Sequence, residues 1–287
     1  MSIARILVPA FGFPQDGIAL AAGIAVAKPF NAHVQLLAVH PYPTDSIPIV
    51  GVPLPLEVVQ AIVQGRESYA RETNARLREM LAATCACAGA TQVQGPRLQR
   101  DGVTCSFRAG YGDLEKALIK SAVLSDLVVL GPLAADTSAS APAFLGMLRG
   151  AQKPVLISKQ APAGRLRKIV VGWDGSASAA RAIRQSIPVL RCAEQVAVTS
   201  IILPGHAAPS VEGPSAYLDR HDVRFHCRKA FPGNLSAADA LLAEAKNDGA
   251  DLVVAGGYGH DQLWEAFFGG ATVSLLADAA MPVLLVH

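Results

Sequence analysis

The feature of this sequence that most constrains its fold is an internal repeat. Three blocks recur in the same order: Arg5–Phe11 with Lys168–Asp174, Ser125–Gly131 with Ala250–Gly256, and Pro154–Ile157 with Pro282–Leu285. Three ordered matches indicate two copies of one structural unit rather than chance similarity. We therefore place one domain at residues 1–160 and a second at residues 166–287. The joint, Lys159–Arg167, is polar and contains Pro and Gly, as interdomain linkers do.

Within each half, short apolar runs alternate with helical patterns. A run such as Leu127–Leu130 is apolar throughout, which is typical of a strand covered on both faces of a parallel sheet. Strand–helix–strand order with right-handed crossovers predicts an α/β fold of two doubly wound domains, each a five-stranded parallel sheet flanked by helices. The expected strands are 5–9, 33–40, 103–108, 126–131 and 154–158 in the first half, and 168–173, 195–203, 223–229, 251–256 and 282–287 in the second.

The first half is longer than the second between its second and third expected strands. This extra segment contains the proline-punctuated stretch Pro41–Pro55 and a predicted helix over Leu56–Ala88. Its apolar residues follow helical spacing, which favours packing against the core over a separate binding face. They are Leu56, Val59, Val63, Ala70, Leu77 and Leu81.

The composition supports buried sheets and narrows the possible partners. Hydrophobic residues make up 51% of the chain and charged residues 17%, so there is ample apolar material for cores. The formal net charge of +2 is too small to indicate a nucleic-acid partner. No apolar run reaches the roughly 18 residues of a membrane span, and the N-terminus lacks the plan of a signal peptide. We therefore expect a soluble, cytoplasmic protein with no membrane partner.

The five cysteines do not indicate a disulfide framework. Their number is odd and their spacing irregular, so reduced thiols are expected. Cys85 and Cys87 form a C-x-C pair without a second pair, which leaves zinc binding as a minor alternative. The cluster of His221, His226 and Cys227 is likewise more typical of surface and strand residues than of ligands. No metal-binding residue is therefore assigned.

A glycine cluster after the fourth strand of the second half is the strongest functional signal. Gly256–His260 reads GGYGH. After nine intervening residues comes Gly269–Thr272 (GGAT), which opens a helical pattern. Ligands of open α/β sheets gather beyond the carboxyl ends of the strands, where glycines let backbone N–H groups approach a phosphate. A helix beginning there favours an anion. Turn formation alone is the alternative explanation of such glycines.

Asp174 ends the first strand of the same half. Its carboxylate could therefore accept hydrogen bonds from a ribose or an adenine edge in the same crevice. Trp173 could stack on adenine, although a packing role has more weight at a strand end. His260 could contact phosphate, with a plain surface position as the weightier alternative.

Two motifs together resemble those of the universal stress protein family. They are V-G-W-D-G-S at residues 171–176 and G-x-x-G-x9-G at residues 256–269. The resemblance covers both halves in outline, and residues 168–287 in motif detail. It implies an adenine nucleotide α-hydrolase-like fold that binds ATP, with Mg²⁺ as its usual companion. The nucleotide-binding residues that the resemblance implies are Asp174, Leu203, Gly256, Gly257, Gly259, Gly269, Gly270, Ala271 and Thr272. Trp173 and His260 are added as candidates from their positions alone.

The motif departs from the family pattern at one position. Gly270 stands where the family has Ser or Thr, and the next hydroxyl is that of Thr272. A lost charge-assisted hydrogen bond weakens binding by roughly 1.5–3 kcal/mol, or about ten- to a hundredfold. The sequence therefore predicts weaker ATP binding, or a preference for a related adenine nucleotide.

The first half lacks these features. Phe11 stands where the second half has Asp174, and the glycine positions read Gly131–Ala134 (GPLA) and Ala141–Phe144 (APAF). Proline removes an N–H donor, and bulkier side chains fill the space that a phosphate needs. We therefore expect this half to be a non-binding structural copy.

These features favour a regulatory protein of the stress response, in which bound ATP acts as a conformational switch. A nucleotide-free scaffold or small-molecule binder is the alternative. Enzymatic turnover has less support, because no Walker A loop or nucleophile–base pair is present, so at most weak ATP hydrolysis is expected. By the family likeness the closing strands pair with each other as an intrachain pseudo-dimer, and whole chains could form a homodimer.

Overall fold

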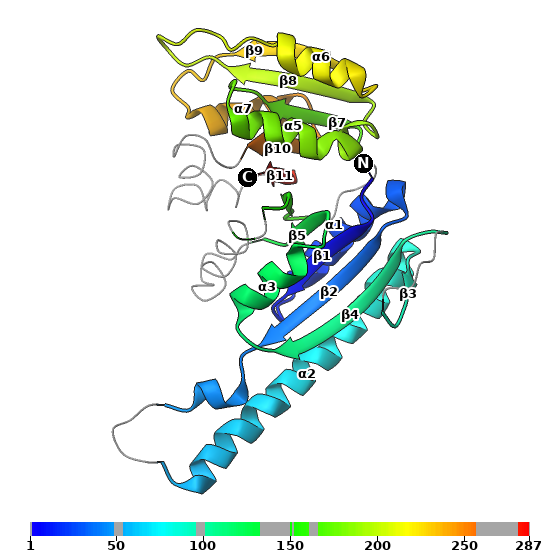
Figure 1. Cartoon of the computed structure of the whole chain (residues 1–287), viewed down its shortest axis with the longest axis vertical. Helices are drawn as coiled ribbons and strands as arrows, with labels where there is room; N and C mark the ends of the chain where they lie inside the picture. Colours follow the sequence, from blue (N-terminus) through cyan, green and yellow to red (C-terminus); the bar gives the residue numbers. More distant parts are fainter. Residues whose placement is uncertain are drawn as a thin grey trace.

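Eleven strands form one continuous sheet in the computed structural model, which describes residues 2–48, 54–95, 101–132, 150, 152–160, 166–256 and 281–286 (Figure 1). The order across the sheet is β3-β4-β2-β1-β5-β6-β11-β10-β7-β8-β9. The strands are β1 Arg5–Ala10, β2 His33–His40, β3 Thr91–Gln92, β4 Thr104–Tyr111, β5 Leu127–Leu130, β6 Val155–Ile157, β7 Lys168–Gly172, β8 Gln195–Ile201, β9 Phe225–Ala230, β10 Leu252–Gly256 and β11 Val283–Val286.

The predicted α/β class and the parallel, helix-flanked sheet are confirmed, with two refinements. The first half has an additional two-residue strand, β3, that pairs with β4. The sheets of the two halves are joined edge to edge, because β6 pairs antiparallel with β11, whereas the other pairs are parallel. The predicted domain boundaries at residues 160 and 166 stay a prediction.

Helices cover both faces of the sheet. The described helices are α1 Asp16–Ala27, η1 Lys28–Phe30, η2 Pro43–Ser46, α2 Leu56–Ala88, α3 Leu114–Ala122, α5 Ala177–Leu190, α6 Glu212–Arg220 and α7 Ala237–Asn247. Buried residues of α1, α2, α5 and α6 share one core with one face of the strands. Buried residues of α3 and α7 belong to a second core on the opposite face. This is the alternation that a doubly wound sheet requires.

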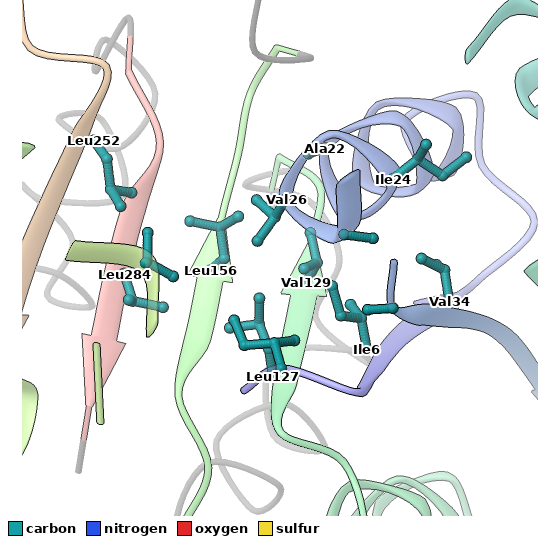
Figure 2. Packing of buried hydrophobic residues seen from close by; sticks show 14 of the residues in the cluster. Ile6, Ala22, Ile24, Val26, Val34, Leu127, Val129, Leu156, Leu252 and Leu284 are labelled. Atoms are coloured by element: carbon teal, nitrogen blue, oxygen red, sulfur yellow. The ribbon is translucent and has the colours of Figure 1, made fainter. Parts of the chain in front are cut away.

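The pairing of β6 with β11 makes the cores of the two halves continuous. Leu156 lies opposite Leu284 in this pair, and both are buried. Figure 2 shows the two side chains between Leu252 of one half and Val129 of the other. The expected pairing of the closing strands within the chain is therefore confirmed.

The long helix α2 has the predicted bounds, but only part of it packs on the core. Its buried residues begin at Ala70 and include Leu77 and Leu81. Leu56, predicted to be a core residue, is 69% exposed. The first turns extend past the sheet as an arm (Figure 1), so that end of the helix has little sheet surface to cover. None of the helices in the described part of the chain is both long and apolar enough to cross a membrane.

Candidate functional site

The described residues of the predicted site meet at the carboxyl ends of three neighbouring strands. Trp173 and Asp174 directly follow β7, Gly256 ends β10, and Leu203 follows β8. The strand β7 pairs with β8 on one side and with β10 on the other. The chain runs outward from β7 in one direction and returns through β10, so these residues lie at the point where the strand order reverses. Open α/β sheets bind their ligands at such a point.

The other predicted site residues lie outside the described residues. They are Gly257, Gly259, His260, Gly269, Gly270, Ala271 and Thr272. The assignment of phosphate to these positions therefore remains a prediction from the sequence.

Asp174 is exposed and is held in place by a local turn. Its Oδ1 accepts a hydrogen bond from the backbone N–H of Ser176 at 2.8 Å, and Gly175 between them has a φ of 82°. Such a φ strongly favours glycine, and the bond is the kind that Asp forms two residues ahead in turns. Only one carboxylate oxygen is committed by this bond, so the other remains available to a ligand.

Ser176 connects this turn to the start of α5. Its hydroxyl oxygen accepts a hydrogen bond from the backbone N–H of Ala179 at 3.1 Å, which makes it the N-cap of the helix. A second hydroxyl, that of Ser178, lies 2.9 Å from the Ser176 hydroxyl. The cap satisfies one of the free N–H groups of the first turn and fixes where the helix begins.

Trp173 has a packing role in this structure. Its indole Nε1 donates a hydrogen bond to the carbonyl of Ser210 at 2.8 Å, and its backbone N–H donates to Thr199 at 2.9 Å. The ring is partly buried against the core. The indole bond holds the ring beside the segment that follows β8, which is a packing contact, and stacking of adenine on this ring stays a prediction.

Gly256 has a structural reason to be glycine. A Cβ atom built on it would lie 2.6 Å from the carbonyl carbon of Ser178 and 2.7 Å from the backbone nitrogen of Ala179. These backbone atoms belong to the first turn of α5, so they cannot rotate away. The glycine therefore permits the close approach of β10 and α5, and this reason is independent of any phosphate.

In the first half, the corresponding junction is the turn from β1 to α1. A buried carboxylate closes this junction, because it accepts the backbone N–H bonds of the turn. Oδ2 of Asp16 accepts backbone N–H bonds from Phe11, Gly12 and Phe13 at 2.9, 2.7 and 3.1 Å. Asp16 is 5% exposed, and burial raises its pKa to about 6 although the three N–H donors lower it. The sequence does not reveal this role of Asp16, because the convergence of three N–H donors on its carboxylate is visible only in the folded chain.

The close approach seen at Gly256 recurs in the first half. A Cβ atom on Gly131 would lie 2.8 Å from the carbonyl oxygen of Gln15, at the start of α1. The matched glycines of the repeat thus perform the same packing in both halves, including the half that we expect to bind nothing. Within the described residues, no cluster of three or more His, Cys, Asp or Glu side chains could hold a metal ion.

Solved structures show the same fold over nearly the whole chain. A universal stress protein from Archaeoglobus fulgidus is 14% identical, with a TM-score of 0.66, over 98% of this chain and 95% of its own. A putative universal stress protein from Pseudomonas aeruginosa UCBPP-PA14 is 18% identical, with a TM-score of 0.52, over 99% of this chain and 93% of its own. No protein-family model matches this sequence, and no curated protein matches it. The resemblance predicted from the motifs is therefore confirmed at the level of the fold.

Proposed function

We propose that the second half binds ATP or a related adenine nucleotide, and that the protein is a regulator of the stress response whose conformation follows nucleotide binding. The observation that carries this proposal is the position of Asp174, an exposed carboxylate at the reversal point of the strand order. The fold shared with structures described as universal stress proteins supports the physiological part of the proposal.

Different residues of the second half would contact different parts of the nucleotide. The free oxygen of Asp174 would accept a hydrogen bond from a ribose hydroxyl or from the adenine amino group. Leu203 would supply apolar contact at the end of β8. The loops that contain Gly257, Gly259, His260 and Gly269–Thr272 would hold the phosphates through backbone N–H groups. Trp173 would fix the loop after β8 beside this crevice through its bond to Ser210.

The first half supports the proposal by contrast. Its three loop N–H groups are already bonded to Asp16, and Phe11 replaces the strand-end carboxylate. A second nucleotide at this junction would have to displace a buried carboxylate, so we expect one nucleotide per chain. Because no catalytic set is apparent in the sequence, the proposed role is binding, with at most weak ATP hydrolysis.

A nucleotide-free scaffold is the second candidate, and two observations favour it. The packing role of Gly256 explains one motif glycine without a ligand. The exposed arm of α2 offers apolar side chains, such as Leu56 and Val58, to another molecule. In either case the pairing of β6 with β11 makes the chain an intrachain pseudo-dimer, and a homodimer of whole chains would use a different surface.

Isothermal calorimetry with Mg²⁺ and ATP tests the proposal. We expect micromolar binding at one site, abolished by Gly259→Val and weakened about tenfold by Asp174→Asn. Asparagine keeps the Oδ1 acceptor for Ser176, so the turn survives while the charge is lost. The absence of heat from a folded, nucleotide-free wild type would rule out ATP binding and favour the scaffold.

Asp222→Asn is the matched control for this titration. Asp222 lies in the same half, its side chain is 86% exposed, and its 4.0 Å ion pair with Arg191 contributes little to stability. Its φ of 55° suits asparagine as well as aspartate. This variant should bind ATP like the wild type, so an equal loss in both variants would show a nonspecific charge effect.

A further inference from the structure

An apolar cleft lies between α5 and the segment 209–217, close to the carboxyl end of β7. Its volume is about 550 Å³, within the range of small-molecule sites. The residues that determine its chemistry are Trp173, Ile183, Arg184, Pro209, Pro214 and Tyr217. The nucleotide proposal uses the edge of the sheet, whereas this cleft opens between two helices beside it.

The two helices present one face each to the cleft. Ala180, Ile183 and Arg184 are spaced three and four residues apart on α5, so they lie on one side of that helix. Gly213 and Tyr217 have the same relation on α6. The cleft is therefore built from regular secondary structure rather than from loop residues alone.

Two aromatic rings in the cleft are held in fixed orientations. The indole of Trp173 is anchored by its 2.8 Å bond to the carbonyl of Ser210. The ring of Tyr217 packs against that of His221, with centroids 4.5 Å apart and planes inclined by 52°. Rings that are already ordered lose little conformational freedom when a flat ligand packs on them.

One cationic side chain lies at this otherwise apolar surface. Arg184 is exposed, and no hydrogen bond or ion pair joins it to another described residue. None of the described lining residues is acidic. A guanidinium presents a planar set of N–H donors that matches carboxylate and sulfonate oxygens. The charge at this cleft therefore favours an anion.

We propose that this cleft is a second ligand site, which binds a flat aromatic molecule carrying one negative charge. The rings pack on Trp173 and Tyr217, and the anionic group bonds to Arg184. The proposal does not rest on nucleotide binding, although the site borders the strand end that carries Asp174.

Gly213 offers a way to fill the cleft. Because a side chain before Pro214 disfavours the helical conformation, circular dichroism must show that each Gly213 variant is folded. Gly213 lies on α6, and a Cβ atom built on it meets nothing within 4 Å. A leucine at this position enters the open space of the cleft and excludes a ligand. Gly65 is the matched control, because it is also a helical glycine with nothing within 4 Å of its Cβ position, and it lies on α2.

The test uses 8-anilinonaphthalene-1-sulfonate and its uncharged analogue N-phenyl-1-naphthylamine. Both are titrated into the full chain carrying Trp264→Phe, which leaves Trp173 as its single tryptophan. Energy transfer from Trp173 to the probe reports binding close to that ring. We expect saturable transfer with one site for the sulfonate probe.

Two variants separate the steric and the electrostatic parts of the site. Gly213→Leu should weaken both probes by at least about tenfold, and Gly65→Leu should weaken neither. Arg184→Gln should weaken the sulfonate probe by about three- to tenfold and leave the uncharged probe within about twofold. Gly213→Ala, a smaller change, should give an intermediate loss and serves if the leucine variant does not fold.

Two outcomes would overturn the proposal. Unchanged affinity of both probes in a folded Gly213→Leu variant would show that the probes bind elsewhere. Competitive displacement of the sulfonate probe by ATP would make the cleft part of the nucleotide crevice rather than a separate site. Failure of ATP to bind, by contrast, would remove the nucleotide proposal and leave this one standing.

Discussion

The junction from β1 to α1 and the junction from β7 to α5 share a backbone plan but differ in what fills it. Both contain a left-handed glycine, with φ of 85° at Gly12 and 82° at Gly175. Both need a glycine on the neighbouring strand, Gly131 or Gly256, for the helix to approach. The first junction directs three N–H groups to the buried carboxylate of Asp16. The second uses a serine cap and leaves its carboxylate exposed.

This difference shows that the two halves of a repeat can share their packing while the polar groups of their junctions have different partners. The glycines that admit the helix are under the same steric constraint in both halves, so their presence says little about a ligand. What distinguishes the halves is whether the polar groups of the junction already have protein partners. Buried polar groups that are satisfied within the chain gain nothing from a ligand.

The largest effect that would test this comparison is expected from Gly256→Ala. We expect it to lower the free energy of unfolding by about 3 kcal/mol, because the new methyl group meets rigid backbone at 2.6 Å. Gly131→Ala, which meets one carbonyl oxygen at 2.8 Å, should lower it by about 1–2 kcal/mol. Urea unfolding followed by circular dichroism measures both.

Gly65→Ala is the control for this pair, because its site on α2 is open. It should be neutral, or stabilising by up to about 1 kcal/mol through helix propensity. If Gly256→Ala were as mild as this control, the close approach would not explain the glycine, and a role in ligand binding would become the better explanation.

An intermediate effect is expected from the buried carboxylate of the first junction. The folded-state pKa of Asp16 is raised from 3.8 to about 6, so the native state holds this proton more tightly than the unfolded chain. Its contribution to stability is therefore complete below about pH 4 and is lost as the pH rises through 6. The loss amounts to about 3 kcal/mol at most, at 1.36 kcal/mol per pH unit.

Unfolding free energies at pH 4 and pH 7 test this expectation. The wild type should lose about 2–3 kcal/mol more than Asp16→Asn over this interval, because asparagine does not titrate. The opposite slope would mean that the three N–H donors outweigh burial and keep the carboxylate ionised. In that case the first junction would resemble a preformed anion site rather than a closed one.

The smallest effect is expected from the N-cap residues of α5 and α1, which differ in whether their side chains bond to the helix. Ser176→Ala removes the N-cap bond to Ala179 and should lower the free energy of unfolding by about 1 kcal/mol. Gln15, at the corresponding end of α1, makes no side-chain cap bond, so Gln15→Ala should change stability by less than about 0.5 kcal/mol. Equal effects of the two changes would show that the capping difference is unimportant.

Much of the fold could be predicted because its signals are local. The apolar run of β2 and the long helix α2 have the bounds that the sequence indicates. The closing strands were recognisable because nearly identical segments, PVLI at residues 154–157 and PVLL at residues 282–285, occur near the end of each half. Such patterns depend on periodicity and order along the chain, which neighbouring residues determine.

The features that the sequence did not reveal depend on how the folded chain brings groups together, in two cases from distant parts of the sequence. Helical spacing placed Leu56 in the core, although the sheet ends before it and leaves it exposed. The role of Gly256 depends on backbone atoms of Ser178, far away in the sequence. The closure of the first junction depends on the side chain of Asp16 turning back onto three N–H groups. The glycines beyond residue 256 lie outside the described residues, so their role remains predicted.

The antiparallel pair of β6 and β11 joins the first half of each chain to the second half of the same chain. If the domains were separate proteins that associated through this edge, the associated fraction would depend on their concentration. Two domains with open junctions could then pair with each other. Here both edge strands belong to one chain, so each is always available to the other at a high effective concentration. Dilution should therefore not separate the halves. Each copy of the protein keeps one closed junction and one open junction, at opposite edges of the sheet because β6 and β11 run antiparallel, and a symmetric pair of open junctions cannot form through this edge.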